Sequence, residues 1–175
     1  MMKLENDTVY LRALEPEDLD FLFEVENDIS LWEISTTQKP FSRKDLKDYL
    51  ANSDRDIYEV KQLRLVIERK SDNAPIGLID LFDFDPFNKR AGLGILIKKE
   101  YQNKGFGSSS IKLLNEYAFR YLDLNQLYAH VPSNNKASIS LFDHLGFLKT
   151  GNLKHWLKTE KGFTDVLVYQ IFKNQ

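Results

Sequence analysis

The sequence contains no cysteine among its 175 residues, which excludes disulfides, thiolate metal ligands and a cysteine nucleophile together. Its three histidines, His130, His144 and His155, show no spacing typical of a metal site, so we expect no metal centre. No run approaches the roughly 20 apolar residues that cross a bilayer, and residues 1–7 lack the apolar core of a secretion signal. These absences predict a cytoplasmic protein that does not contact a membrane.

An excess of charge of either sign is also missing. The formal net charge is −2, which argues against a general nucleic-acid binder. The two signs are nevertheless unevenly distributed, because residues 1–60 hold 7 Lys/Arg against 15 Asp/Glu, whereas residues 61–175 hold 17 against 11. Acidic helices usually present a solvated face. The alternative is that the acidic part faces a cationic substrate and the basic part faces phosphates.

The length and the 42% hydrophobic content suit one well-filled core, so we predict a single domain over residues 1–175. An antiparallel meander is followed by strand–helix–strand units, which predicts a mixed α/β sheet. Residue periodicity predicts strands at 9–13, 63–68, 75–82, 91–97, 127–131, from 147 and at 166–172, and helices at 16–26, 42–51, from the glycine turn to 122, and at 135–145.

The stretch 95–108 runs an apolar strand directly into a glycine turn that opens a helix. Gly105 and Gly107 leave backbone N–H groups uncovered, and the positive end of the helix points at the same place, so the turn could hold a pyrophosphate. Lys104 precedes its glycine, which excludes a Walker loop, and a third glycine is missing, which excludes a dinucleotide fingerprint. A loop that simply needs positive φ is the plain alternative.

Two motifs together resemble the GNAT superfamily of acyl-CoA-dependent N-acyltransferases. The residues 102–107, Gln-Asn-Lys-Gly-Phe-Gly, resemble its Gln/Arg-x-x-Gly-x-Gly/Ala motif, and 135–147 resemble its helix with Asn-x-x-Ser and a Leu-Gly-Phe ending. The resemblance extends from Val9 to the C-terminal strand and falls within the branch of ribosomal-protein N-terminal acetyltransferases and bacterial spermidine acetyltransferases. It implies a GNAT-type mixed, mainly antiparallel twisted sheet, flanked by helices and with splayed central strands.

The resemblance also implies that acetyl-CoA is the acyl donor and that no metal is used. It places the pyrophosphate on the N–H groups of the turn and the pantetheine arm along the preceding strand, where a β-bulge commonly splays two strands. It assigns a pantetheine contact to Asn135, for which a helix cap is the plain alternative. The implied cofactor-binding residues are Leu96, Ile97, Gln102, Asn103, Lys104, Gly105, Phe106, Gly107, Ser108, Asn135, Ser138 and Phe142.

The chemistry that the resemblance implies is direct attack of a neutral amine on the thioester in a ternary complex. A backbone N–H between Leu96 and Lys98 is the expected oxyanion donor. Phe142 stands where many relatives have a tyrosine regarded as the acid for the departing thiolate. Ser138 lies one helical turn away on the same face and is the substitute candidate, with a solvent-facing or back-bonded serine as the alternative.

Candidate acids for the acceptor side are Asp80, Asp83 and Glu33, because Gly92 stands where several relatives carry a glutamate. Asp80 and Asp83 fall where spermidine acetyltransferases have acidic residues, and Glu33 matches an acceptor-side acid of the polyamine enzymes. Strand alternation places Asp83 and Asp85 on one face if the strand continues through them. Solvated strand ends are the plain alternative for each.

The sequence therefore predicts an N-acetyltransferase that transfers an acetyl group from acetyl-CoA to a primary amine. The amine is a polyamine-like small molecule or a protein N-terminus, and a homodimer is expected as in relatives. Phe142 and Gly92 favour the alternative of a non-catalytic acyl-CoA-binding or sensor module. A structural interaction domain without CoA binding is a third class.

Overall fold

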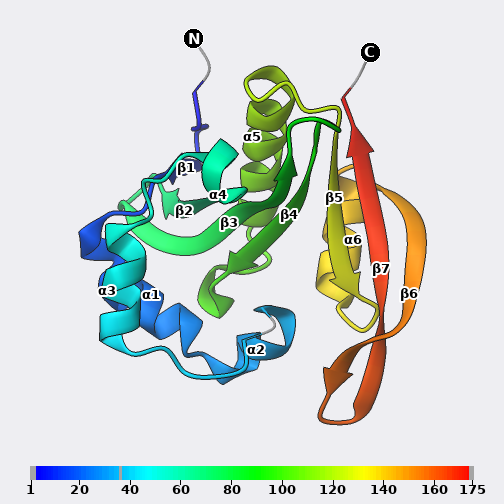
Figure 1. Cartoon of the computed structure of the whole chain (residues 1–175), viewed down its shortest axis with the longest axis horizontal. Coiled ribbons are helices and arrows are strands. Elements are labelled where there is room, and N and C mark those ends of the chain that lie inside the picture. Colours follow the sequence, from blue (N-terminus) through cyan, green and yellow to red (C-terminus); the bar gives the residue numbers. More distant parts are fainter. Residues whose placement is uncertain (1–2, 36, 174–175) are drawn as a thin grey trace.

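A computed structural model describes residues 3–35 and 37–173, without the side chains of 33–35. Seven strands form one sheet in the order β1-β2-β3-β4-β5-β7-β6 (Figure 1). The strands are β1 (Val9–Arg12), β2 (Leu63–Arg69), β3 (Ala74–Asp85), β4 (Arg90–Ile97), β5 (Gln126–Pro132), β6 (Leu148–Thr159) and β7 (Gly162–Phe172). Neighbouring strands are antiparallel except for the parallel pair β4–β5. The predicted mixed, mainly antiparallel sheet is confirmed.

The helices include two that the sequence did not predict, α2 and α4. In α2 the carboxylate of Asp28 accepts the N–H of Ser30 at 2.9 Å, and in α4 Asp56 accepts the N–H of Tyr58 at 2.7 Å. Both helices are too short to show a hydrophobic period. No helix in the described ranges is long and apolar enough to cross a membrane. The helices are α1 (Leu19–Glu26), α2 (Ile29–Ser35), α3 (Arg43–Ala51), α4 (Ile57–Val60), α5 (Phe106–Arg120) and α6 (Lys136–His144), with 3-10 turns η1 (Pro16–Asp18) and η2 (Lys99–Tyr101).

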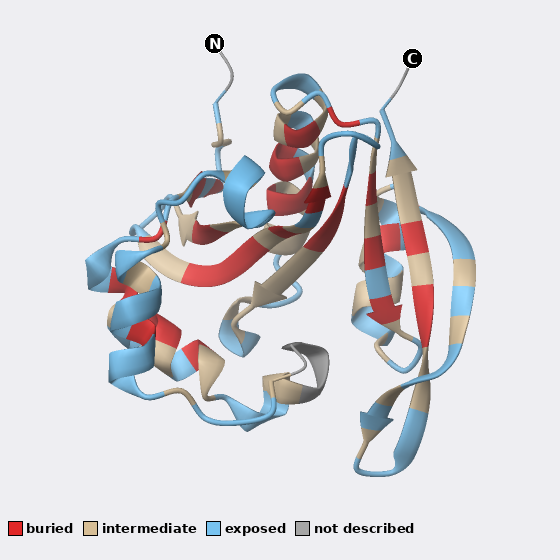
Figure 2. Ribbon diagram, in the orientation of Figure 1, coloured by how far each residue is buried: buried red, intermediate tan, exposed pale blue. Residues whose placement is uncertain are grey.

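The core has two parts, one on each face of the sheet. Alternation along β2 directs Leu65 and Ile67 into the larger cluster, which includes Leu114 of α5, and Val66 into the smaller one, which includes Leu22 of α1. Figure 2 shows the buried residues concentrated on the inner strands and on the sheet-facing side of α5. Burial on both faces makes the central strands a rigid platform.

Strands β4 and β5 pair only where they start. Residues 90–92 of β4 pair with 126–128 of β5, and beyond these three pairs the strands diverge, although each continues for several residues. Figure 1 shows the resulting V-shaped opening, with α2 near its wide end. The predicted splay of the central strands is therefore confirmed.

The bulge that the resemblance placed at the splay lies elsewhere. The β3–β4 register runs without a break from Gly77 opposite Ile97 to Phe82 opposite Gly92, and it then shifts between Phe82 and Asp85. The extra residue belongs to β3, where Asp83 has a φ of +48°. The separation of β4 from β5 therefore occurs without a bulge at that place, and the bulge instead changes the direction of the end of β3.

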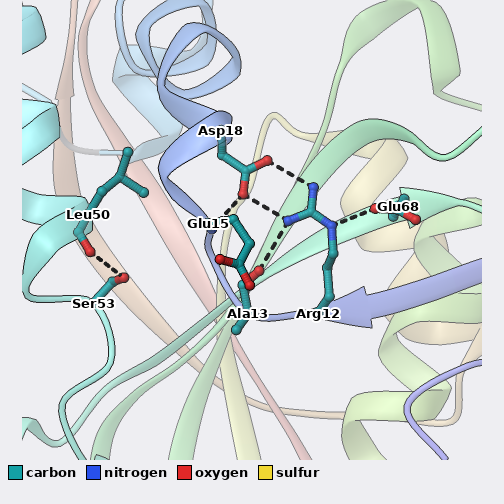
Figure 3. A network of polar contacts seen from close by, with 7 residues as sticks. All are labelled: Arg12, Ala13, Glu15, Asp18, Leu50, Ser53 and Glu68. Atoms are coloured by element: carbon teal, nitrogen blue, oxygen red, sulfur yellow. Dashed lines mark hydrogen bonds and ion pairs between the residues drawn. The ribbon is translucent and has the colours of Figure 1, made fainter.

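Arg12, at the end of β1, links the η1 turn to β2 through ion pairs (Figure 3). Its two terminal nitrogens each donate to Asp18 at 2.8 Å, and Nε donates to Glu68 of β2 at 2.5 Å. The N–H of Glu15 also donates to Asp18, at 2.8 Å. Burial alone would raise the pKa of Asp18, but the hydrogen bonds from Arg12 and from Glu15 outweigh it and lower that pKa. This ion-pair network fixes where α1 begins.

Candidate active site

The glycine turn presents free backbone amides at the start of α5. Gly105 caps the helix with φ +82°, a conformation that glycine adopts without steric cost. In the first backbone hydrogen bond of the helix, the N–H of Ser109 donates to the carbonyl of Gly105 at 3.0 Å. The amides of Phe106, Gly107 and Ser108 therefore have no intrahelical partner and lie at the positive end of a 15-residue helix. This geometry suits a phosphate.

A cavity of about 300 Å³ lies against this turn, and we call it the turn cavity. Of the predicted cofactor residues, only Lys104 and Phe142 are absent from its described lining. The Lys104 ammonium instead donates to the carbonyl of Glu100 at 2.8 Å. The lining residues are Leu31, Ile95, Leu96, Ile97, Tyr101, Gln102, Asn103, Gly105, Phe106, Gly107, Ser108, Asn135, Ala137, Ser138 and Leu141.

A second cavity, of about 560 Å³, occupies the opening between β4 and β5, and we call it the sheet cavity. It shares Ile95, Leu96, Asn135 and Ser138 with the turn cavity, so the two meet where β4 ends and α6 begins. Its lining residues are Glu26, Gln62, Arg64, Leu78, Asp80, Phe82, Leu93, Gly94, Ile95, Leu96, Ala129, His130, Val131, Pro132, Asn135, Ser138 and Phe142.

Asn135 serves as a helix cap and also lines both cavities. Its side-chain oxygen accepts the N–H of Ser138 at 3.1 Å, which is the plain alternative that the sequence allowed. The cap uses only Oδ1, so the capping role does not remove the residue from the cavity walls. Ser138 is half-buried at the junction of the two cavities, rather than facing bulk solvent.

The end of β4 offers one strand edge to the opening. The N–H of Lys98 donates to the carbonyl of Ile76 at 2.9 Å, so antiparallel alternation directs the backbone of Leu96 toward β3 and that of Ile97 away from it. The carbonyl of Ile97 accepts from Gln102 Nε2 at 2.9 Å, as this orientation requires. Of the backbone amides from Leu96 to Lys98, that of Ile97 points away from β3, so it is the remaining candidate for the expected oxyanion donor.

An ion-pair cluster forms one wall of the sheet cavity. Arg64 donates to Asp80 from Nε at 2.7 Å and to Glu26 at 2.8 Å. Burial alone would lower the pKa of Arg64, but the carboxylates, Asp80 foremost, raise it, so the guanidinium stays charged. The candidate Asp80 is thus a paired carboxylate. Sequence reasoning missed Arg64 and the role of Glu26 because α1, β2 and β3 bring this cluster together.

Aromatic rings close the inner end of the sheet cavity. A Cβ atom added at Gly92 would lie 2.3 Å from the ring of Phe82, so this ring fills the space that a larger residue would need. Phe142 is 4% exposed; its ring packs edge-on against Phe147 at 4.9 Å and stacks on Tyr169 at 5.9 Å between ring centroids. Phe142 therefore lines the sheet cavity and not the turn cavity.

Asp83 lies apart from Asp80. The positive φ of Asp83 places it in a third cavity, the outer cavity, of about 620 Å³, where Tyr128 donates to it at 3.4 Å. Asp85 lines the same cavity, although the register shift between Phe82 and Asp85 interrupts the regular alternation on which their predicted shared face depended. Glu33 belongs to α2, but its side chain lies outside the described part of the chain. The outer cavity is lined by Asp83, Asp85, Arg90, Gln126, Tyr128, His130, Val168 and Gln170.

A splayed sheet with a turn of free backbone amides on one side and a charged cavity on the other is the arrangement expected of a two-substrate transferase. A family model described as an acetyltransferase (GNAT) domain matches residues 8–148. The chain is 30% identical over 168 residues to spermidine N(1)-acetyltransferase of Escherichia coli K12, covering 96% of this chain and 88% of that protein. The spermidine N(1)-acetyltransferase of Vibrio cholerae is 31% identical over 151 residues, which cover 85% of this chain and 83% of that protein.

A solved structure agrees with these relatives. The crystal structure of spermidine N-acetyltransferase from Vibrio cholerae in complex with CoA and spermine has a TM-score of 0.86 and 27% identity, covering 95% of this chain and 96% of that one. The chain belongs to the GNAT acetyltransferase family, and it is an N-acetyltransferase. The resemblance inferred from the two sequence motifs is confirmed.

Proposed function

We propose that this enzyme transfers an acetyl group from acetyl-CoA to a primary amine, either a polyamine-like small molecule or a protein N-terminus. The observation that carries the proposal is the meeting of two cavities at Ile95, Leu96, Asn135 and Ser138. The turn cavity has the backbone amides that an anionic acyl donor needs, and the sheet cavity has the charged side chains that suit an amine. The relative from Vibrio cholerae binds CoA and spermine in one structure.

The residues of the turn cavity fit the donor. The amides of Phe106, Gly107 and Ser108 would hold the pyrophosphate, because they are unpaired within the helix and lie at its positive end. The edge of β4 at Ile97 would hold the pantetheine amides, with Asn135 on the opposite wall. Acetyl-CoA supplies the activated acyl group. Holding both ligands in one site turns the reaction into an effectively unimolecular one.

The sheet cavity would position the amine. Glu26 and Asp80 carry two negative charges against the single positive charge of Arg64, so the cluster keeps a net charge of −1 that attracts an ammonium group. Ser138 carries the one hydroxyl among the described residues that line both cavities, and it would donate the proton that Phe142 cannot supply. The amide of Ile97 would stabilise the oxyanion.

The proposal is tested by thiol release. Incubating the protein with acetyl-CoA and a panel of polyamines, other primary amines and peptides with free N-termini should release free CoA with at least one acceptor. Acetyl-CoA should also raise the unfolding temperature, because it binds the folded state alone. Absence of both effects would overturn the proposal.

The proposal includes self-association, with a homodimer as the smallest assembly. A dodecameric structure of spermidine N-acetyltransferase from Vibrio cholerae supports it, at a TM-score of 0.79 and 29% identity. Light scattering coupled to size exclusion should give a mass at least twice the 20.5 kDa of the chain. A mass of a single chain at every concentration would contradict this part of the proposal.

A further inference from the structure

The sheet cavity contains a base that no part of the proposed chemistry yet uses. Glu26 and Asp80 are the carboxylates among its described lining residues, and Arg64 engages both. Both carboxylates are therefore already engaged in ion pairs with Arg64. His130 is the remaining described lining residue whose side chain is of a type that serves as a general base.

His130 is also the one described residue that lines both the sheet cavity and the outer cavity. It lies on β5, and its side chain is exposed. Because the outer cavity opens to solvent, the imidazole stands between the proposed amine position and bulk water. A proton accepted on one side can therefore leave on the other.

The groups around His130 come from several strands. Its ring lies 5.5 Å from that of Tyr128, whose pKa is raised by burial and then by the neighbouring Asp83, so the phenol remains protonated. The uncharged Val168 and Gln170 of β7 line the outer cavity beside it. The charged residues that share a cavity with His130 are Asp83, Asp85 and Arg90 on the outer side and Glu26, Arg64 and Asp80 on the inner side.

We propose that His130 accepts the proton of the acceptor ammonium and returns it to water through the outer cavity. This inference rests on the proposed function. The ammonium gives one proton to the neutral imidazole, and the freed lone pair forms the C–N bond at the thioester carbonyl. The C–S bond breaks with its electron pair on sulfur. The second proton of the nitrogen goes to the thiolate or to water, and the imidazolium releases its own proton to solvent.

A base is needed because a primary amine has a pKa near 10 and is mostly protonated at neutral pH. A general base matched to the working pH contributes on the order of 10²–10⁴ in rate. With His130 as the base, the reaction requires the neutral imidazole and the protonated amine. The value of kcat/KM is then independent of pH between the pKa of the imidazole and that of the amine. Without a base, kcat/KM follows the free amine alone.

The test is the pH profile of kcat/KM for the acceptor identified by thiol release, with saturating acetyl-CoA. His130→Gln should lower kcat/KM at pH 7 by about 100-fold or more. Its profile should rise tenfold per pH unit up to the ionisation of the amine, in place of the level region of the wild type. The matched control is His144→Gln, which changes an exposed histidine of α6 that lines none of the three cavities. It should keep the wild-type profile.

Two further readouts separate a base from a structural residue. A structural defect would lower the whole profile by one constant factor, without changing its shape. In His130→Ala, added imidazole should restore part of the lost rate, because the outer cavity admits a small base. Wild-type turnover with an unchanged profile shape in His130→Gln would overturn the role of His130 alone. A wild-type protein without turnover on any acceptor would overturn both this inference and the proposed function.

Discussion

The contact between Gly92 and Phe82 links one residue choice to the shape of the sheet cavity. The glycine lies directly beneath the ring, so a larger residue there must displace it. We expect Gly92→Ala to push the Phe82 ring into the sheet cavity and to raise KM for the amine roughly tenfold, equivalent to about 1.4 kcal/mol. The Kd of acetyl-CoA, measured by calorimetry, should not change.

A glycine in an open part of the sheet provides the control for this substitution. A Cβ atom added at Gly151 would make ordinary contact with Val168 at 3.6 Å, so Gly151→Ala should leave KM unchanged. An unaltered KM in Gly92→Ala would show that the ring of Phe82 moves without entering the space that the amine uses.

Phe142 permits a direct test of how the thiolate leaves. The ring is buried and borders the sheet cavity, and a phenol at this position could donate a proton to sulfur. A thiolate with a pKa near 8.5 is a tolerable leaving group at neutral pH, so such a donor helps only where protonation of the thiolate limits the rate. We expect Phe142→Tyr to raise kcat by up to about 100-fold in thiol-release assays. A kcat equal to the wild-type value at every pH would exclude thiolate protonation as the limiting step.

The roles of residues could be predicted where the residues of one feature are neighbours along the sequence. The turn around Gly105 and the cap at Asn135 are each encoded within a few neighbouring positions, and the structure places both beside one cavity. The pairing of Arg64 with Glu26 and Asp80 could not be predicted, because it depends on three elements meeting in space. A glutamate among the apolar positions of α1 is the signal that could have indicated it.

At the scale of elements, the Arg12 network joins β1, η1 and β2. Removing the guanidinium would leave the buried carboxylate of Asp18 and the half-buried carboxylate of Glu68 without their partner. We expect Arg12→Met to lower the free energy of unfolding by about 2–4 kcal/mol at pH 7, less than a fully buried pair would lose because Arg12 is partly exposed. Urea unfolding measures this. Arg120→Met, which removes an exposed pair with Glu116, should cost about 0.5 kcal/mol or less.

The same network sets a dependence on pH. The pKa of Asp18 is lower in the folded protein than in the unfolded chain, so its contribution to stability is complete above the unfolded value of about 3.9. It is lost as the pH falls from there through the folded pKa. The difference in stability between wild type and Arg12→Met should therefore shrink below about pH 4. A difference that stays constant down to pH 2 would contradict this account.

Helices and strands could be predicted from sequence where they are long enough to show a clear hydrophobic period. The long helix α5 and the β2–β3 hairpin show clear periodicity, whereas α2 and α4 each follow a single aspartate and have only 7 and 4 residues. The end of β6 was also missed, because this edge strand is mostly exposed and lacks the alternation of a half-buried strand. The splay of β4 from β5 followed from the family resemblance, not from local pattern.

At the scale of the whole molecule, the uneven charge distribution coincides with the arrangement of the cavities. The acidic first 60 residues include α1, which supplies Glu26 to the sheet cavity. Figure 1 shows α1, α2 and α3 together on one side of the sheet, toward the wide end of the opening between β4 and β5. A cationic acceptor would therefore approach through a region of negative potential.

Salt should weaken that attraction in proportion to the charge of the acceptor. The Debye length falls from about 8 Å at 0.15 M to about 3 Å at 1 M, which screens charges that the acceptor does not touch. At saturating acetyl-CoA, we expect kcat/KM for a triamine to fall by about tenfold over this range, and that for a monoamine by much less. Thiol release at constant pH measures both. Equal salt dependence for the two amines would show that only the contact charges around Arg64, and not the acidic N-terminal part as a whole, select the acceptor.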